Sequence, residues 1–255
     1  MLAELYLQQE MIVRIDGEHS ESCIVGRGVR QGCLLSPLLF SLYAEFMMKD
    51  AMDAVKDGSK VDDKIVKDVR FADDQGMVAS TRIGLQRMMD ALSITAKEYG
   101  MKINVEKTKV MVVSRTGGET VSIYIDGRKV EAVSKFKYLG AWITDDGRCE
   151  VDIKVRIAMA KEAFNKRKEL LTRRMRLNLK KRIIKTLIWS VLLYGDESWS
   201  LRKKNVQKLE AFEMWIWRRI EKISWKDHLS NKKVLKRVKE ENPQSRRLSE
   251  EIKIG

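Results

Sequence analysis

The residues best suited to chemistry are two adjacent acids, Asp73 and Asp74, within the stretch 70–79. Apolar residues flank the pair, a pattern that predicts two strands joined by a tight turn with both carboxylates at its tip. Magnesium is usually held by one or two carboxylates together with waters and substrate phosphates. The pair therefore predicts a magnesium site. Asp is also a common turn residue, so a solvated turn is the alternative interpretation of these residues alone.

A glycine-rich segment precedes the acidic pair. Three glycines fall within residues 26–32, ahead of a helix predicted over residues 36–55 with Ser36 as its N-cap and Pro at its first position. A loop that runs into a helix N-terminus suits contact with a phosphate or a nucleotide. Arg30 and Gln31 add donors for phosphates and base edges.

Short β-prone segments predict the frame around these residues. Residues 11–15 and 22–25 should form a hairpin through Asp16-Gly17, after a short helical turn over residues 2–9. The charged residues 56–67 predict a surface loop that leads into the acidic hairpin.

A helix should follow the acidic hairpin, with Ser80 or Thr81 as N-cap and Gly100 as its stop. Its buried stripe is expected to contain Leu85, Met88, Met89, Leu92, Ile94 and Tyr99. Residues 101–114 then turn into a strand.

Two further hairpin turns are predicted at Gly117-Gly118 and Asp126-Gly127, and residues 136–144 close the β-rich region.

The last two fifths of the chain are helical and basic. We predict helices near residues 150–174, 177–194 and 203–223. Residues 1–150 hold 21 Lys and Arg against 23 Asp and Glu, whereas residues 151–255 hold 29 against 13. An excess this uneven predicts contact with a polyanion such as nucleic acid, and solvated helix faces are the alternative.

Five tryptophans fall in the helical part, and most should anchor a core or an interface, while one or two beside Arg or Lys could stack on bases. They are Trp189, Trp199, Trp215, Trp217 and Trp225.

Composition restricts the class of protein. The chain of 255 residues is 44% apolar, enough for a core, and has no apolar run of the roughly 20 residues that cross a bilayer. Cys23, Cys33 and Cys149 are odd in number and widely spaced, which argues against a disulfide framework or a zinc site. We expect a soluble intracellular protein with reduced cysteines.

Four motifs in order resemble those of the reverse transcriptases of non-LTR (LINE-type) retrotransposons. They are Gly-Val-Arg-Gln-Gly-Cys-x-Leu-Ser-Pro-Leu-Leu-Phe from Gly28, Phe-Ala-Asp-Asp from Phe71, Lys-Ile-Asn-x-x-Lys-Thr-Lys from Lys102 and Phe-Lys-Tyr-Leu-Gly from Phe136. Leu-Leu-Tyr-Gly and Met-Trp-x-x-Arg-Arg in the helical part resemble the thumb of these proteins. Leu34 departs from the pattern, which more usually has Pro there.

The resemblance implies an α+β fold and three regions. Residues 1–146 would be an incomplete palm of a right-hand polymerase, an antiparallel sheet with packed helices. Residues 147–230 would be a basic, all-helical thumb that binds nucleic acid, and residues 231–255 a charged, disordered tail.

The same resemblance implies site residues for an RNA-directed DNA polymerase. Asp73 and Asp74 would be catalytic ligands of Mg²⁺ in a two-metal site. Arg30, Gln31 and Gly32 would bind the template and nucleotide pair.

Lys107 would approach the triphosphate, and a primer grip would contain Phe136, Tyr138, Leu139 and Gly140. The implied partners are an RNA template, a DNA primer and deoxynucleotides, and the implied location is nuclear.

One expected ligand has no counterpart. The family takes a third Asp from an earlier strand, but the only Asp between Met1 and Lys49 is Asp16, in a predicted turn. Neighbouring strand residues point to opposite faces, so Asp73 and Asp74 alone cannot bracket two ions. The fingers would also lie upstream. We therefore expect a truncated polymerase that is inactive alone and exposes apolar surface beside the missing strand.

Two alternatives remain open: a non-catalytic module that binds RNA or hybrid duplex, and a fragment with no selected function. A pure binder should lose affinity steeply with salt and be indifferent to removal of magnesium.

Overall fold

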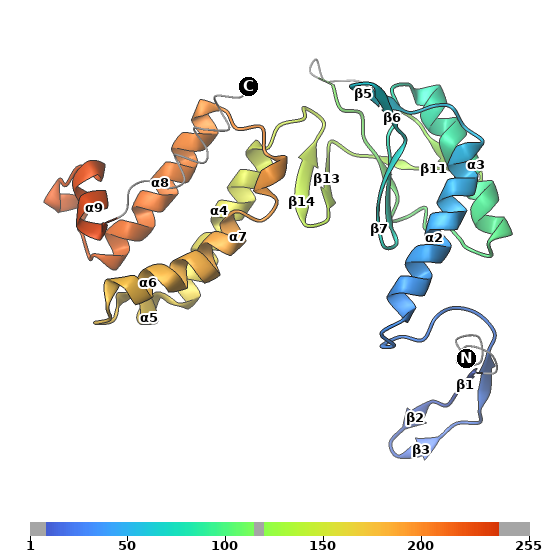
Figure 1. The fold of residues 1–255 in the computed structure, drawn as a ribbon, viewed down its shortest axis with the longest axis horizontal. Coiled ribbons are helices and arrows are strands. Elements are labelled where there is room, and N and C mark those ends of the chain that lie inside the picture. Colours follow the sequence, from blue (N-terminus) through green and yellow to red (C-terminus); the bar gives the residue numbers. More distant parts are fainter. Residues whose placement is uncertain (1–8, 115–119, 240–255) are drawn as a thin grey trace. The chain divides into compact units, whose positions relative to one another are not determined.

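A computed structural model describes residues 9–114 and 120–239, which form two compact units (Figure 1). The first unit takes in residues up to 110 and residues 121–132, and the second takes in the rest. The described residues combine helices with small two-stranded sheets, all antiparallel except one, which confirms the α+β class. None of the helices in this part of the chain is both long and apolar enough to cross a membrane.

The first unit begins with the predicted hairpin. β1 (Gln9–Met11) pairs with β4 (Cys23–Val25), and β2 (Arg14–Ile15) pairs with β3 (Glu18–His19). Asp16 and Gly17 form the turn, with φ of 50° and 93°. This left-handed pair is the turn that Asp-Gly favours. The helical turn expected before it lies outside the described residues, apart from the residue that opens β1.

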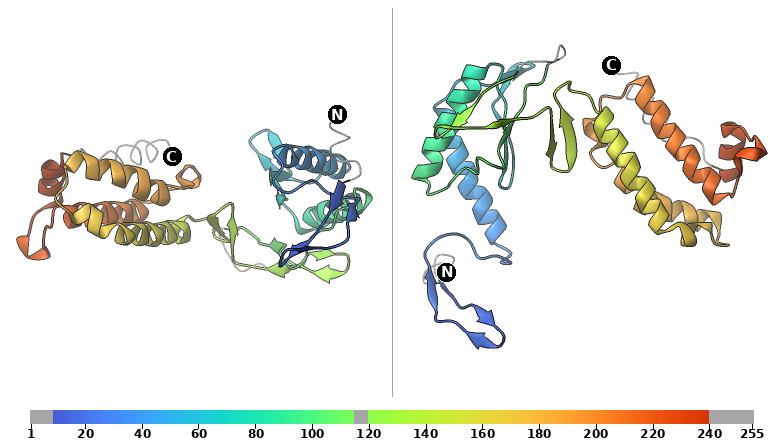
Figure 2. Two further views of the ribbon diagram at one scale, coloured as in Figure 1. Left: turned by 90° about the horizontal axis from the view of Figure 1, so that it is seen from below. Right: turned by 180° about the vertical axis from the view of Figure 1, so that it is seen from behind.

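The helix α2 (Ser36–Asp53) starts one residue earlier than predicted, because Leu35 rather than Ser36 is its N-cap. Ser36 instead donates its hydroxyl to the carbonyl oxygen of Arg30 at 2.5 Å. The buried face of α2 is made of small and flexible side chains, which let it lie closely along α3 (Arg82–Glu98), as Figure 2 shows. Those side chains are Ala44, Met47, Met48, Ala51 and Met52.

Residues 59–66 were expected to be a loop, and that expectation is wrong. They form a hairpin of β5 (Ser59–Val61) and β6 (Lys64–Val66), directly before the predicted acidic hairpin of β7 (Asp68–Phe71) and β8 (Asp74–Met77). Each short strand contains β-branched Val or Ile beside a lysine, and the high charge of the stretch concealed these β-prone residues.

The helix α3 is capped as predicted. The Thr81 hydroxyl accepts the N–H of Gly84 at 3.0 Å, and Gly100 stops the helix with φ 66°. Met88, Met89 and Leu92 are buried as expected, but Ile94 is 60% exposed. Residues two apart on a helix do not share a face, so Ile94 points away from the stripe that Leu92 marks.

Short strands complete the first unit. β9 (Lys109–Val110) pairs in parallel with β12 (Glu131–Ala132), and β10 (Tyr124–Ile125) pairs with β11 (Arg128–Lys129). The Asp126-Gly127 turn is confirmed, whereas the predicted Gly117-Gly118 turn lies outside the described residues.

The second unit joins one hairpin to a helical bundle. β13 (Lys135–Tyr138) pairs with β14 (Ala141–Thr144). The bundle contains α4 (Glu150–Lys166), α5 (Lys168–Thr172), α6 (Leu177–Ile184), the π-helical η1 (Lys185–Trp189), α7 (Ser190–Leu192), the short η2 (Asp196–Ser198), α8 (Lys203–Ile220), the short η3 (Trp225–Asp227) and α9 (Asn231–Val238).

One apolar core holds the bundle together. It includes Phe164, Trp189, Phe212 and Trp217, all at most 7% exposed. Trp189 lies edge-on to Trp217, with ring centroids 6.4 Å apart. Trp189, Trp199 and Trp217 are thus the core anchors that the sequence predicts.

The tail was expected to lack structure from residue 231, and this is wrong for residues 231–238. Ser230 caps α9 by accepting the N–H of Lys233 at 3.5 Å. Val234 and Val238 are fully buried against the bundle core. Two valines four apart dock one helical face, with Leu235 packed beside them, even though four of the eight residues of α9 are basic. Residues 240–255 lie outside the described residues.

Candidate active site and nucleic-acid interface

The acidic hairpin presents its two carboxylates at the tip, as predicted. Phe71 pairs with Asp74, so Ala72 and Asp73 are the two turn residues and Asp74 is the first residue of β8. Both acids are exposed. Ala72 has φ 52°, an unusual conformation for Ala, and such strain is often found at functional sites.

One ion pair and one hydrogen bond hold this hairpin against α2. Arg70 pairs through Nε with Asp68 and through Nη1 with Glu45 of α2, each at 2.6 Å. The hydrogen bond to Asp68, with a further one to Glu45, raises the pKa of Arg70. The Lys67 ammonium also donates to the carbonyl oxygen of Met52 at 2.7 Å. The strand that leads to the acids is therefore fixed to a helix.

Asp73 and Asp74 fit a magnesium ion that keeps waters and substrate phosphates in its coordination shell. They do not make a closed site. Among the described residues there is no group of three or more His, Cys, Asp or Glu side chains that could hold a metal. The two carboxylates alone would therefore supply only part of the magnesium site that the sequence predicts.

The predicted nucleotide-binding residues lie on exposed loops of the first unit. Arg30, Gln31 and Gly32 precede α2, where Gly32 has φ 84° and an added Cβ would meet nothing within 4 Å. Lys107 follows α3 in a turn, and its N–H donates to Asn104 Oδ1 at 3.1 Å. That these four residues together surround a nucleoside triphosphate remains a prediction.

The four predicted primer-grip residues share one hairpin in the second unit. Phe136 and Tyr138 lie on β13, and Leu139 and Gly140 form the turn to β14, with φ of 47° and 84°. Glycine is favoured at position 140 by its positive φ, and an added Cβ would also make a tight contact of 3.3 Å with the Tyr194 ring.

Residues of the bundle bind the backbone of this turn. The Tyr194 hydroxyl donates to the carbonyl oxygen of Leu139 at 3.0 Å, and Arg156 Nη2 donates to that of Gly140 at 2.7 Å. The Arg156 guanidinium also lies over the Tyr194 ring, 4.4 Å from its centroid. Both turn carbonyls are thereby held in place.

A buried acid extends this contact to β14. Asp152 is 2% exposed and lies one helical turn from Arg156, which is 5% exposed. Its carboxylate accepts the backbone N–H of Trp142 at 3.0 Å and the indole N–H of Trp199 at 2.9 Å. The hairpin is thus tied to α4 by a buried polar network, in which Arg156 Nε lies 3.8 Å from Asp152 and has no hydrogen-bond partner among the described residues.

Sequence reasoning missed Asp152, Arg156 and Tyr194. The spacing of Asp152 and Arg156 on a helix was a signal, but it is also the spacing of common surface ion pairs. Only the structure shows that this pair is buried.

Trp215 has two cationic side chains beside its ring. It is partly buried and stacks on Phe212, with centroids 5.7 Å apart. The Arg219 guanidinium lies 4.2 Å and the Lys161 ammonium 5.8 Å from its centroid. The ring therefore sits in a cationic setting, although Arg219 occupies part of its face.

Apolar side chains are exposed just before and along α2 and at the end of β7. Leu34 is 96%, Leu38 60%, Phe46 61% and Phe71 62% exposed. Such a surface suits contact with further polypeptide.

Comparison with known proteins agrees with the motifs. The sequence profile of the family described as "Reverse transcriptase (RNA-dependent DNA polymerase)" matches residues 2–143. The chain is 32% identical over 142 residues to the Pol polyprotein of the type-2 retrotransposable element R2DM of Drosophila melanogaster, covering 52% of this chain and 13% of that protein.

It is also 26% identical over 226 residues to the RNA-directed DNA polymerase from the mobile element jockey of the same fly, covering 84% of this chain and 24% of that protein. The chain thus spans a quarter or less of the length of these relatives. With the family profile matching more than half of its residues, the chain belongs to the reverse transcriptase family, with relatives among non-LTR retrotransposons.

Proposed function

We propose that this chain is the part of an RNA-directed DNA polymerase that carries two of its metal-binding carboxylates and part of its grip on nucleic acid. The observation that carries the proposal is the tip of the β7–β8 hairpin, where Asp73 and Asp74 are exposed together on a hairpin that Arg70 fixes to α2. The family match and the motif order support it.

Within this proposal, residues 1–146 act as palm and residues 147–230 as thumb, in an enzyme that works in the nucleus on an RNA template, a DNA primer and deoxynucleotides. Asp73 and Asp74 would hold Mg²⁺, which supplies charge stabilisation to phosphoryl oxygens when bound. Arg30, Gln31 and Gly32 would orient the nucleotide against the template.

Lys107 would neutralise charge on the triphosphate. The Phe136–Gly140 segment would hold the primer strand, in a position fixed by Tyr194, Arg156 and Asp152.

The chain alone should not extend a primer. Two-metal chemistry needs carboxylates that converge from more than one direction, and the described residues offer two adjacent ones. Magnesium-dependent extension on RNA by the isolated chain, lost on Asp73→Ala, would contradict this.

A chimera tests the proposed activity directly. The segment of the jockey polymerase that aligns with this chain is replaced by this chain, and cDNA synthesis is measured. We expect magnesium-dependent synthesis that falls at least about a hundredfold on Asp73→Ala, because charge stabilisation of several kcal/mol is lost. The matched control is Asp62→Ala, in the neighbouring β5–β6 turn, which should leave synthesis unchanged. Equal activity of the two variants would refute the assignment.

A second candidate, a binder of RNA or hybrid duplex without catalysis, is favoured by the incomplete carboxylate set together with the basic second unit. Affinity that falls steeply with salt and ignores EDTA, together with an inactive chimera, would support this candidate instead.

A further inference from the structure

Positive charge in the second unit is concentrated in residues 163–192. They include ten Lys and Arg residues but only one acid, Glu169. They form the end of α4, the short α5, the turn that follows it, and then α6, η1 and α7 without a break. A stretch with so uneven a charge indicates a surface for a polyanion.

Three arginines of this stretch lie in the turn between α5 and α6, which we call the arginine turn. They are Arg173, Arg174 and Arg176, and all three are exposed. Within the described part of the chain, none of the three guanidinium groups makes an ion pair or a hydrogen bond. The first turn of α6 contains no acidic residue, so the helix dipole adds to the positive charge of the arginines.

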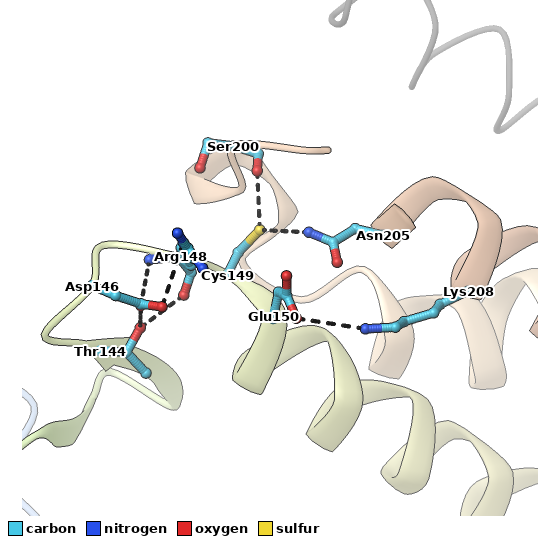
Figure 3. A network of polar contacts seen from close by, with 8 residues as sticks. All are labelled: Thr144, Asp146, Arg148, Cys149, Glu150, Ser200, Asn205 and Lys208. Carbon is cyan, nitrogen blue, oxygen red and sulfur yellow. Dashed lines mark hydrogen bonds and ion pairs between the residues drawn. The ribbon is translucent and has the colours of Figure 1, made fainter. Parts of the chain in front are cut away.

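At other places in the second unit, cations are paired with acids. Where α4 and α8 begin, Arg148 lies 3.6 Å from Asp146, and Lys208 lies 3.7 Å from Glu150 (Figure 3). A cation that already faces a carboxylate attracts a further anion less strongly. The arginine turn is therefore better suited to hold an anion than this end of the bundle.

The chemistry of the arginine turn favours phosphate groups. A guanidinium group can make two parallel hydrogen bonds to one phosphate. Residues 173–176 extend over at most about 10 Å of chain. Successive phosphates of one strand are about 3.4 Å apart along a duplex axis, so the turn can reach about two or three of them.

Stacking on bases is not available at this turn. No aromatic residue lies between Phe164 and Trp189 in the sequence, and Trp189 is buried. Proteins that bind single strands usually stack bases on aromatic rings. The turn and the helix after it offer no such ring, which favours a duplex, whose bases are already stacked on one another.

We propose that Arg173, Arg174 and Arg176 bind the phosphate backbone of a nucleic-acid duplex, whatever its sequence. The inference rests on the proposed function and adds a second place of contact. α4 is tied to the β13–β14 hairpin through Asp152 and Arg156 near its first residues, and the arginine turn lies beyond its last residues, after α5 (Figure 1).

The length of α4 separates these two places. Its 17 residues make it about 25 Å long. A duplex held both at the hairpin and at the arginine turn therefore extends over at least about seven base pairs.

Fluorescence anisotropy of the full chain with a labelled RNA–DNA hybrid of about 16 base pairs, long enough to reach both places, tests the proposal. The triple variant Arg173→Gln, Arg174→Gln, Arg176→Gln should weaken binding at least about tenfold at low salt. It should also lower the salt slope by about three, because each phosphate contact contributes about one. The preference of the chain for the hybrid over the RNA strand alone should fall in this variant.

The matched control is the triple variant Arg202→Gln, Lys203→Gln, Lys204→Gln. It removes the same charge from exposed residues at the start of α8, the end of the bundle where cations are paired. It should lower the salt slope by less than about one.

Thermal unfolding checks that each variant is folded. The arginine variant should unfold at the temperature of the wild type, because its three arginines have no partner among the described residues. If the triple variant does not fold, Arg174→Gln alone replaces it and should lower the salt slope by about one.

An unchanged salt slope in the arginine variant, or an equal loss of affinity in its control, would overturn the site and leave the proposed function standing. An unchanged preference for the hybrid would overturn the choice of a duplex. Competition by polyglutamate as strong as that by unlabelled hybrid, at equal negative charge, would indicate an acidic polypeptide and overturn the choice of nucleic acid. Failure of the wild type to bind the hybrid would overturn both the site and the proposed grip.

Discussion

Two neighbouring hairpins of the first unit each contain two adjacent aspartates, but the aspartates lie at different positions relative to the turn. In β5–β6, Val61 pairs with Lys64, so Asp62 and Asp63 are both turn residues. In β7–β8, Phe71 pairs with Asp74, so the turn is Ala72-Asp73 and the second acid belongs to the strand. The same dipeptide is thus a loop tip in one place and a strand end in the other.

The two hairpins are also held differently. Lys60 and Asp63 lie 4.0 Å apart with almost fully exposed side chains, whereas Arg70 is 25% exposed and bridges Asp68 to Glu45 at 2.6 Å. An exposed pair of the first kind contributes little. Two adjacent acids are therefore better candidates for a functional site when ion pairs hold their hairpin in place and when the strand pairing puts one of them on a strand.

The largest loss in free energy of unfolding is expected at a third hairpin, β13–β14, which the buried Asp152 ties to α4. Asp152→Ala removes the acceptor for Trp142 and Trp199 and leaves Arg156 as a buried charge with no acid beside it on α4. Breaking such a pair should cost about 3–5 kcal/mol in free energy of unfolding. Urea denaturation followed by circular dichroism measures it, and Glu162→Ala, in the exposed pair with Lys166, should change it by less than about 0.5 kcal/mol. Equal effects would mean that the pair does not anchor the hairpin.

Arg70→Ala should cause the next largest loss in free energy of unfolding. It leaves Asp68, whose side chain is 10% exposed, without its cation, so we expect a loss of about 1.5–3 kcal/mol. Lys60→Ala in the sister hairpin should cost less than about 1 kcal/mol. The same urea experiment compares the two, and a larger effect at Lys60 would reverse the comparison.

The smallest change in free energy of unfolding is expected from substitutions in the turns of the β5–β6 and β7–β8 hairpins. Ala72 and Asp62 both have φ 52°, which Ala tolerates less well than Asp. Ala72→Gly should stabilise the first unit by about 1 kcal/mol, and Asp62→Gly by less. A destabilised Ala72→Gly variant would show that this turn is not strained.

Local signals predicted much of this fold. Asp16-Gly17 and Asp126-Gly127 form the expected turns, and the Thr81 cap and the Gly100 stop bound their helix, because these residues act on the backbone within a few residues of themselves. The acidic hairpin was predicted for the same reason.

What the sequence could not show depends on burial. The charged residues 59–66 form strands, α9 docks through two valines, and the Asp152–Arg156 pair lies inside the bundle. Tertiary packing determines whether such charged segments form strands, dock or become buried. Charge in the sequence alone predicts that a residue is exposed to solvent. For the site, motif order indicated Asp73 and Asp74, but the residues that fix the Leu139-Gly140 turn became visible only through their contacts.

Titration with Mn²⁺, an ion that substitutes for Mg²⁺ and is detected by electron paramagnetic resonance, tests most directly whether Asp73 and Asp74 bind a metal ion. The full chain is compared with the Asp73→Asn, Asp74→Asn pair of substitutions and with the matched Asp62→Asn, Asp63→Asn pair. We predict that the first pair weakens the tightest cation binding at least about tenfold, a loss of about 1.4 kcal/mol, and that the second leaves it unchanged. Equal weakening by both, or by neither, would contradict the assignment of Asp73 and Asp74 to a metal site.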